Sequence, residues 1–125
     1  MQFLALIYQN EQIQQRFTKE EWGKIYAEYG AVTKDLAGKG QLLAGYGLQP
    51  VGKAMTVRSR DGKVSGVEGP AYATEDSLSG VNLIEAPDLA AATVIAAKLP
   101  SVRWGCVEVR PLMEYKSSAE KTYMR

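Results

Sequence analysis

The chain has 125 residues and a formal net charge of +1, a length that suits one domain. It contains no histidine, which excludes a Ser-His-Asp triad, a histidine general base and most catalytic zinc sites. Its one cysteine, Cys106, excludes an intrachain disulfide and a thiolate cluster. The near-neutral charge, with basic residues dispersed along the chain, argues against a nucleic-acid partner.

The first eight residues are apolar, but they lack the basic segment and the length of a secretory signal. No apolar stretch approaches the roughly 20 residues that a membrane span needs. The unpaired Cys106 suits a reducing compartment. We therefore expect a cytoplasmic protein that does not contact a membrane.

The first part of the chain predicts a strand, a loop and a long helix. Residues 3–8 are apolar on both alternating faces, as in a strand covered on both sides, and the polar residues 9–15 predict a loop. Thr18 and Glu21 have the spacing of a capping box, in which each side chain bonds the other's backbone amide. Apolar residues then recur every three or four positions, which predicts a helix over 19–37.

The rest of the chain predicts further strands, one hairpin and a second helix. Asp61-Gly62 between two alternating runs favours a type I′ turn, because both central residues need a positive φ. Asp88 is the expected N-cap of the second helix, and Pro100 ends that helix near residue 99. The expected strands cover 41–47, 54–60, 63–68, 80–85 and 102–110, with a loop over 71–79, a domain over 1–113 and a polar tail over 114–125.

This order, β-α-β-(β-β)-β-α-β, predicts an α+β fold of the ferredoxin-like, split βαβ type with an inserted β-hairpin. Both helices then cover one face of a mainly antiparallel sheet. An open face that carries apolar residues is typical of an interface, so we expect a homodimer through the open sheet face. The alternative is that the C-terminal tail folds back over this face. The last strand contributes to it Trp104, Cys106, Glu108 and Arg110.

Six segments have a recognisable order and spacing, namely 1–8, 57–63, 68–71, 78–84, 86–89 and 107–111. Over residues 1–113 the chain resembles the YCII-related domain family, in the subgroup named for an Asp-Gly-Pro-Phe (DGPF) motif. The resemblance implies a dimeric α+β barrel of ferredoxin-like subunits with mostly unassigned roles. Some relatives look like small-molecule enzymes that use a His–Asp pair. Many members of the subgroup occur beside extracytoplasmic-function sigma factors, which implies a regulatory or accessory role.

The chain departs from the family motif where chemistry is expected. The motif aspartate is Glu68 and the motif phenylalanine is Ala71. The acidic residue usual soon afterwards falls on Ala73, and the later one falls on Asp76. Because the relatives' histidine has no counterpart, their His–Asp mechanism cannot operate here. The resemblance therefore leaves open whether the protein is an enzyme.

Aromatic residues supply one group of candidate site residues. Trp22, Tyr26 and Tyr29 lie on the apolar stripe of the first helix. They form either part of the core or the aromatic wall of a small-molecule pocket between helix and sheet. Tyr8 and Tyr46 are candidates for the same wall.

Charged residues in and after the hairpin supply a second group. Arg58 is either an anion-binding residue or a solvated charge that pairs with Glu68 across the hairpin. Glu68 is either an acid or base at a pocket mouth or part of a turn. Glu75 and Asp76 either share a proton, hold a cation such as Mg²⁺, or are solvated.

These residues predict a homodimer that binds a small anionic or aromatic molecule. Any catalysis would use Glu68 or Asp76 as a general acid or base, with no cofactor and no metal. The alternative is a non-enzymatic regulatory or accessory protein, associated with an extracytoplasmic-function sigma factor system, that acts by protein–protein contact. The predicted ligand-binding residues are Tyr8, Trp22, Tyr26, Arg58, Glu68, Tyr72 and Asp76.

Overall fold

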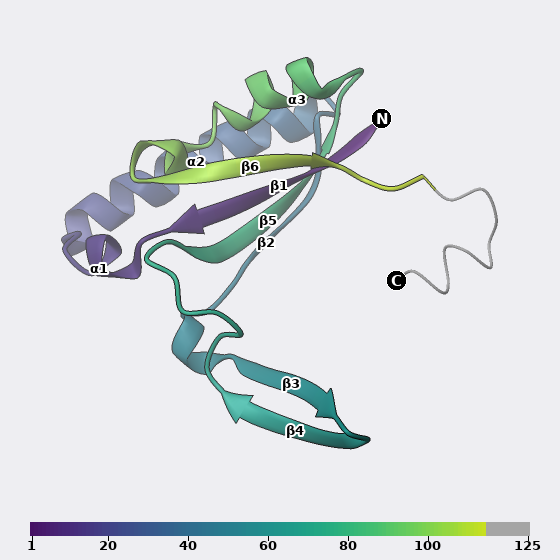
Figure 1. The fold of residues 1–125 in the computed structure, drawn as a ribbon. Helices are drawn as coiled ribbons and strands as arrows, with labels where there is room; N and C mark the ends of the chain where they lie inside the picture. Colours follow the sequence, from purple (N-terminus) through teal and green to yellow (C-terminus); the bar gives the residue numbers. More distant parts are fainter. Residues whose placement is uncertain (115–125) are drawn as a thin grey trace.

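The computed structural model describes residues 1–114, and its main sheet has four antiparallel strands in the order β2-β5-β1-β6 (Figure 1). The chain leaves β1, crosses over β5 and returns as β2, which is the split βαβ connection. The predicted α+β, ferredoxin-like fold is therefore confirmed. The strands are β1 (Gln2–Gln9), β2 (Leu42–Gly47), β5 (Ser77–Glu85) and β6 (Gly105–Pro111).

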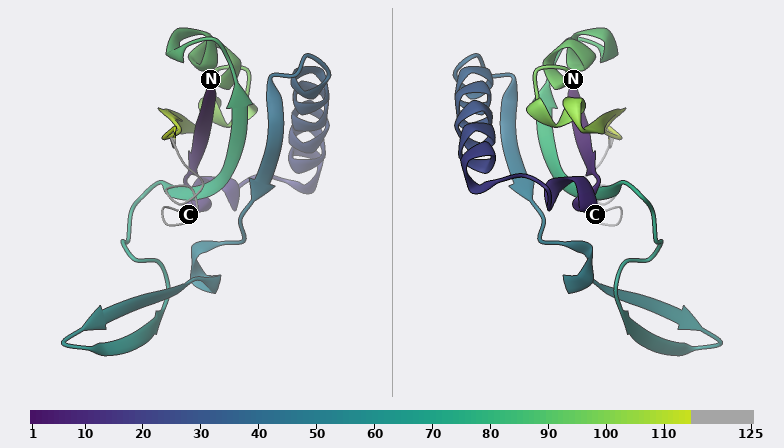
Figure 2. Two further views of the ribbon diagram at one scale, coloured as in Figure 1. Left: turned by 90° about the vertical axis from the view of Figure 1, so that its right-hand side faces the viewer. Right: turned by 90° about the vertical axis from the view of Figure 1, so that its left-hand side faces the viewer.

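Helices α2 (Lys19–Gly38) and α3 (Leu89–Ala96) lie on one side of this sheet (Figures 1 and 2). The predicted capping box begins α2, because Thr18 Oγ1 accepts the Glu21 amide and Glu21 Oε1 accepts the Thr18 amide, each at 3.1 Å. Asp88 caps α3 by accepting the Ala91 amide at 2.8 Å, as predicted. Both start signals act within four residues, so the sequence is enough to recognise them.

The core lies between the helices and the face of the sheet that they cover. Along β1, residues at alternate positions are buried, while the residues between them are half-buried and point to the open face. The first strand is thus apolar on both faces, as predicted. The largest buried apolar side chains of the core are Phe3, Leu36, Ile84 and Leu99.

Several element boundaries differ from the sequence-based prediction, and α3 ends at Ala96, before the expected end near residue 99. Part of the expected loop over 9–15 is a short helix, α1 (Glu11–Gln14), because the Asn10 side chain accepts two amides of its first turn. Strand β5 begins three residues earlier than expected. The last strand begins three residues later, at Gly105, because Pro100 starts the 3₁₀ helix η2 (Pro100–Arg103). Trp104 therefore precedes β6, and its predicted place on the open sheet face is wrong.

The inserted hairpin forms a separate two-stranded sheet of β3 (Met55–Arg60) and β4 (Lys63–Glu68), which we call the arm. Asp61 and Gly62 have φ values of 52° and 76°, which confirms the predicted turn with two positive φ angles. The 3₁₀ helix η1 (Val51–Lys53) precedes the arm. The arm extends from the end of the main sheet, on the side away from α2 (Figures 1 and 2).

Residues 115–125, most of the predicted polar tail, lie outside the described residues, and so does the alternative that this tail covers the open face. Within residues 1–114, no helix is both long and apolar enough to cross a membrane.

Candidate functional site

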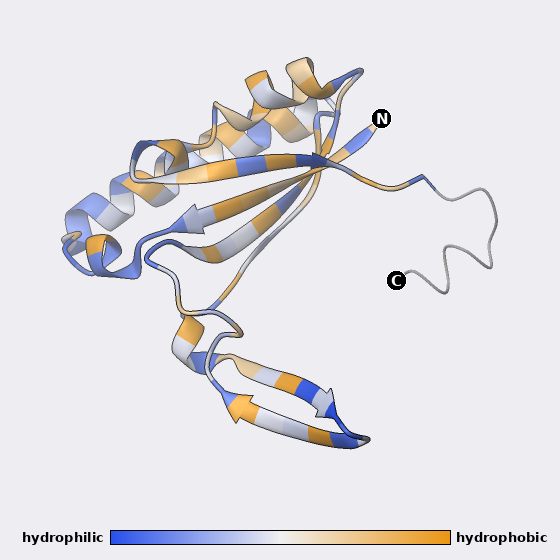
Figure 3. Ribbon diagram, in the orientation of Figure 1, coloured by the Kyte–Doolittle hydropathy of each residue, from blue (hydrophilic) through white to orange (hydrophobic). Residues whose placement is uncertain are grey.

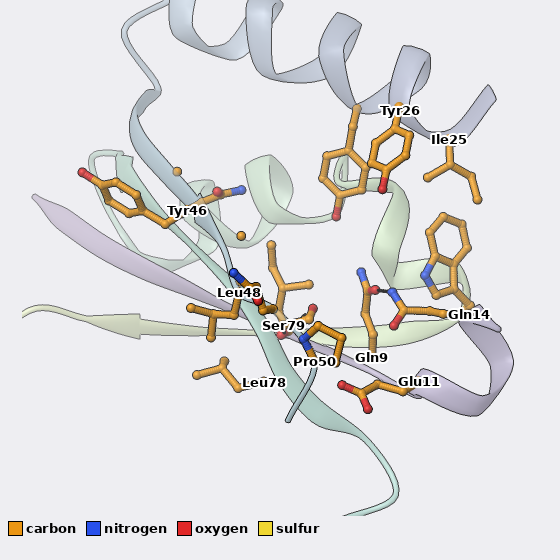
Figure 4. A pocket seen from close by; sticks show the side chains of 18 of the residues that line it. Gln9, Glu11, Gln14, Ile25, Tyr26, Tyr46, Leu48, Pro50, Leu78 and Ser79 are labelled. Carbon is orange, nitrogen blue, oxygen red and sulfur yellow. Dashed lines mark hydrogen bonds between the residues drawn. The ribbon is translucent and has the colours of Figure 1, made fainter. Parts of the chain in front are cut away.

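A cavity of about 800 Å³ lies between α2 and the helix-facing side of the sheet (Figure 4). Glycines on the facing strands create it. Gly47 pairs with Gly80 and Gly45 pairs with Asn82, and all four residues line the cavity. Since directly paired residues point to the same face, three positions that would carry side chains toward α2 carry none. The sheet therefore leaves a hollow below this helix.

Aromatic rings form one wall of the cavity. Trp22 and Tyr26 are stacked, with ring centroids 5.5 Å apart and planes at 23°. Phe17 contacts Trp22 and Trp104 edge-on at 5.3 and 5.5 Å. This chain of rings joins the start of α2 to the residue before β6. Offset stacking leaves the outer ring faces available to a planar ligand.

Three polar residues of the lining, Gln9, Gln14 and Tyr29, belong to a hydrogen-bond network that continues to Ser101, outside the lining. Ser101 is fully buried; its hydroxyl accepts a hydrogen bond from Gln9 Nε2 and is hydrogen-bonded to the Tyr29 hydroxyl. Gln14 Nε2 donates to Gln9 Oε1, and Figure 4 shows these two amides side by side. This network satisfies buried polar groups that would otherwise destabilise the fold.

Two polar groups in the lining have no hydrogen-bond partner among residues 1–114. The indole Nε1 of Trp104 is buried and has no acceptor there. The side chain of Asn82, which is 7% exposed, also makes no hydrogen bond to the described residues. Buried polar groups are normally paired, so both have hydrogen-bonding capacity that a ligand or water would satisfy.

The charge of the lining is low. Glu11 is the one charged residue that lines the cavity within the described chain, and its Oε1 accepts the Val51 amide at 2.9 Å. No lysine or arginine of residues 1–114 lines it. A site for an anion normally presents cationic or amide donors to the charge. The lining thus suits an uncharged ligand better than an anion.

A model of the YCII-related domain matches residues 1–116 of this chain. The chain belongs to the YCII-related domain family. It is also 30% identical, over 118 residues, to an uncharacterized protein of Rhizobium meliloti (strain 1021), a match that covers 93% of this chain and 95% of the relative. The YCII-related part of the predicted resemblance is confirmed, and this relative adds no activity to it.

The structure separates the residues predicted to bind a ligand in this YCII-related domain. Trp22 and Tyr26 line the cavity, whereas Tyr8 does not. Tyr8 lies on the open face of the sheet, where its hydroxyl donates to Glu108 Oε1 at 3.3 Å. Its desolvation and the nearby Glu108 carboxylate raise the pKa of Tyr8. Of the other aromatic candidates, Tyr29 on α2 and Tyr46 on β2 also line the cavity, so the aromatic candidates other than Tyr8 and Tyr72 share one site.

The charged candidates lie on the arm and the loop after it, outside the cavity lining. Arg58 Nη2 donates to the Ala71 carbonyl at 3.2 Å. The predicted pairing of Arg58 with Glu68 is wrong, because the two-residue turn sets a register that places Arg58 opposite Ser65 and Glu68 opposite Met55. The other candidates of this part of the chain are Tyr72 and Asp76.

The adjacent carboxylates after the arm do not form part of a larger ligand set. No group of three or more His, Cys, Asp or Glu residues within 1–114 is arranged to hold a metal ion. Glu75 and Asp76 are both exposed. The geometry adds nothing to the hypothesis that they hold Mg²⁺.

Sequence reasoning missed the polar residues of the cavity. Gln9 continues the buried alternation of Phe3, Ala5 and Ile7, and Asn82 lies between two buried positions of β5. An amide at a core-facing strand position is an available signal, because a buried polar group needs a partner. The partner of Gln9, Ser101, which lies outside the lining, carries no such local signal.

An ion pair holds α2 against the segment that carries Trp104. Arg103 donates two hydrogen bonds to the Glu28 carboxylate, at 2.6 and 2.7 Å, and its guanidinium lies 5.2 Å from the centre of the Trp104 ring. The hydrogen bond from Arg103 lowers the pKa of Glu28, so the pair remains charged at neutral pH. Because both side chains are partly exposed, we assign the pair a positioning role.

Tyr29 gives a prediction about alkaline pH. Burial raises the pKa of the Tyr29 phenol above its ordinary value, and the hydrogen bond with Ser101 offsets part of this rise. In the unfolded chain Tyr29 ionises near pH 10, while the folded protein keeps it neutral. Its contribution to stability is therefore present below that pH and is lost as the pH rises through it.

We expect the free energy of unfolding, measured with urea at pH 8 and pH 11, to fall less in Tyr29→Phe than in the unmodified protein. All other ionisable groups are the same in the two proteins, so their effects cancel in this comparison. An equal fall in both would contradict the prediction.

Proposed function

We propose that this YCII-related domain binds a small, uncharged aromatic molecule in the cavity below α2. The observation that carries the proposal is a hollow of about 800 Å³ with an aromatic wall and a buried Trp104 Nε1 that has no hydrogen-bond partner among residues 1–114. Ligand sites commonly measure about 300 to 1,000 Å³ and combine apolar walls with a few polar groups. The cavity fits this description in size and in lining.

The lining narrows the class of ligand. The stacked rings of Trp22 and Tyr26 favour a planar ring, and the free Trp104 N–H favours an acceptor such as a carbonyl or ring nitrogen. The Asn82 amide offers one donor group and one acceptor. An aromatic amide or a nitrogen heterocycle satisfies all three features, and the lack of basic residues in the described lining disfavours a carboxylate.

The proposal is for binding rather than for a reaction. Glu11 is the acid in the described lining, and one of its oxygens already accepts a backbone amide. Glu68 and Asp76 lie outside the lining, so a catalytic role for either stays a prediction from the sequence. We also retain three predictions from the sequence as proposals. The first is membership of the DGPF subgroup, which Gly69-Pro70 directly after β4 supports. The others are a domain that ends near residue 113 and a cytoplasmic location.

We further propose that the protein is a homodimer through the open sheet face, in the manner of a dimeric α+β barrel. The support is the apolar character of this face: Leu4 pairs with Leu83 and Leu6 pairs with Val81, all half-buried and turned away from the helices. Tyr46, paired with Val81, is 68% exposed on the same face. Such a patch favours association.

The ligand proposal is tested with benzamide, nicotinamide and indole as neutral probes and benzoate as an anionic probe. We expect at least one neutral probe to raise the melting temperature saturably, because ligand binding stabilises the folded state. Benzoate should bind more weakly. The proposal fails if no neutral probe binds, and recovery of a protein partner in that case would favour the regulatory alternative.

Gly47→Phe is expected to weaken binding of the best neutral probe by about tenfold or more, or about 1.4 kcal/mol. A Cβ at Gly47 meets no atom within 4 Å, so the new ring enters the cavity without a backbone clash. Gly52→Phe is the matched control, since its Cβ is equally free and Gly52 does not line the cavity. Isothermal titration gives both affinities, and equal binding by the two variants would place the ligand elsewhere.

A further inference from the structure

The arm is an unusually exposed part of this protein. Strands β3 and β4 pair with each other and with no other strand of residues 1–114, and every residue of β4 is exposed. An isolated two-stranded ribbon is marginally stable in water and normally needs a further surface to pack on. The arm therefore has the character of a segment that is completed by a contact.

The two faces of the arm differ in chemistry. The register places Val57 opposite Gly66 and Ser59 opposite Val64, so Met55, Val57 and Val64 share one face. They are 59%, 64% and 74% exposed. Figure 3 shows apolar positions spaced along both strands. The opposite face carries the cations Arg58, Arg60 and Lys63 together with Val67, while Glu68 lies opposite Met55 on the first face.

The arm projects beyond the sheet on the side opposite to α2 and α3, which is the side of the open face (Figure 2). The arm and the open sheet face therefore lie on the same side of the chain (Figure 2). One molecule placed against the open face also comes within the region of the arm. A copy related by a twofold axis presents the same two surfaces in return. A single symmetric contact therefore covers the arm and the open sheet face of both copies.

We propose that the apolar face of the arm, formed by Met55, Val57 and Val64, docks against a second copy of this chain seated on the open sheet face. This proposal rests on the homodimer proposed above and adds a second contact to it. A stable dimer buries about 800 Å² on each partner. Docking of the arm adds buried area to that supplied by the four-stranded sheet. Docking by this face leaves the three cations in solvent. Glu68 pairs with Met55 at the base of the arm and shares the docking face, so its carboxylate has to stay at the solvated rim of the contact.

Adjacent residues of β4 give a matched pair of variants. Val64→Asp places a carboxylate on the apolar face, and Ser65→Asp places the same group one residue later on the basic face. Sedimentation velocity over a dilution series measures the dimer dissociation constant of each. We expect Val64→Asp to raise it by about tenfold or more, since a buried unpaired carboxylate is costly, and Ser65→Asp to change it less than about threefold.

The outcomes separate the two proposals. An unmodified protein that stays monomeric overturns both the homodimer and the docking of the arm. A dimer that both variants weaken equally, or that neither weakens, overturns the docking of the arm and leaves the open-face dimer standing. A dimer that is insensitive to Val64→Asp but lost on removal of residues 115–125 would assign the contact to the tail. Far-UV circular dichroism checks that each variant stays folded.

Discussion

Gly105→Ala is expected to destabilise the fold by about 2 kcal/mol or more, because an added Cβ would lie 2.0 Å from the Tyr8 carbonyl oxygen and 3.2 Å from Gln9 Cα. Both neighbours are backbone atoms of β1, so neither moves without disturbing the β1–β6 pairing, in which Gly105 lies opposite Gln9. No side-chain rotation relieves such a contact. Urea denaturation measures the loss in the free energy of unfolding.

The matched control is Gly47→Ala, another strand glycine, whose added Cβ meets no atom within 4 Å. It should change stability by less than about 0.5 kcal/mol. The comparison also bears on the cavity. Gly105 directly follows Trp104 and lies opposite Gln9, and both of these neighbours line the cavity. Equal stabilities of the two variants would contradict the role of this close approach.

Ser101→Ala is expected to cost about 2 kcal/mol, which is more than the loss of an ordinary hydrogen bond. The Ser101 hydroxyl is fully buried and serves both Gln9 and Tyr29. Its removal leaves two polar groups without their partner in a site of low exposure, and each retains a desolvation cost. Thr93→Ala is the control, since the Thr93 hydroxyl donates to the Leu89 carbonyl and is exposed.

A double-mutant cycle with Tyr29→Phe isolates the interaction between the two hydroxyls. We expect a coupling energy of about 1 kcal/mol between Ser101→Ala and Tyr29→Phe. Once one of the two hydroxyls has been removed, removing the other no longer breaks the hydrogen bond between them, so the second substitution costs less. Additive effects, measured by urea denaturation, would mean that the two hydroxyls act independently. The same variants measured for probe binding would show whether this network also orders the cavity.

Local signals predicted much of the fold. The capping box of Thr18 and Glu21, the cap at Asp88 and the turn at Asp61-Gly62 each act within a few residues, and each was confirmed. The alternation of β1 likewise predicted a strand covered on both sides. These features need no knowledge of distant segments, since neighbouring residues satisfy them.

The position of Trp104 illustrates what local patterns miss. Alternation counted back from Arg110 through Cys106 places Trp104 on the open face, but η2 occupies the preceding residues and the strand starts only at Gly105. The indole therefore joins the aromatic wall below α2. The prediction that charged residues of the arm line the cavity depends on where the arm lies. Among the described residues β3 and β4 pair only with each other, and local sequence patterns do not reveal this separation from the main sheet.

The sequence by itself determined the order of elements, the faces of its strands and the absence of histidine chemistry. The tertiary structure decided where a cavity forms. Gly45, Gly47 and Gly80 are separated along the chain, and only the pairing of β2 with β5 brings them onto one hollow surface. Strand register and helix placement depend on packing of the whole core, so contacts between distant segments cannot be read from local spacing.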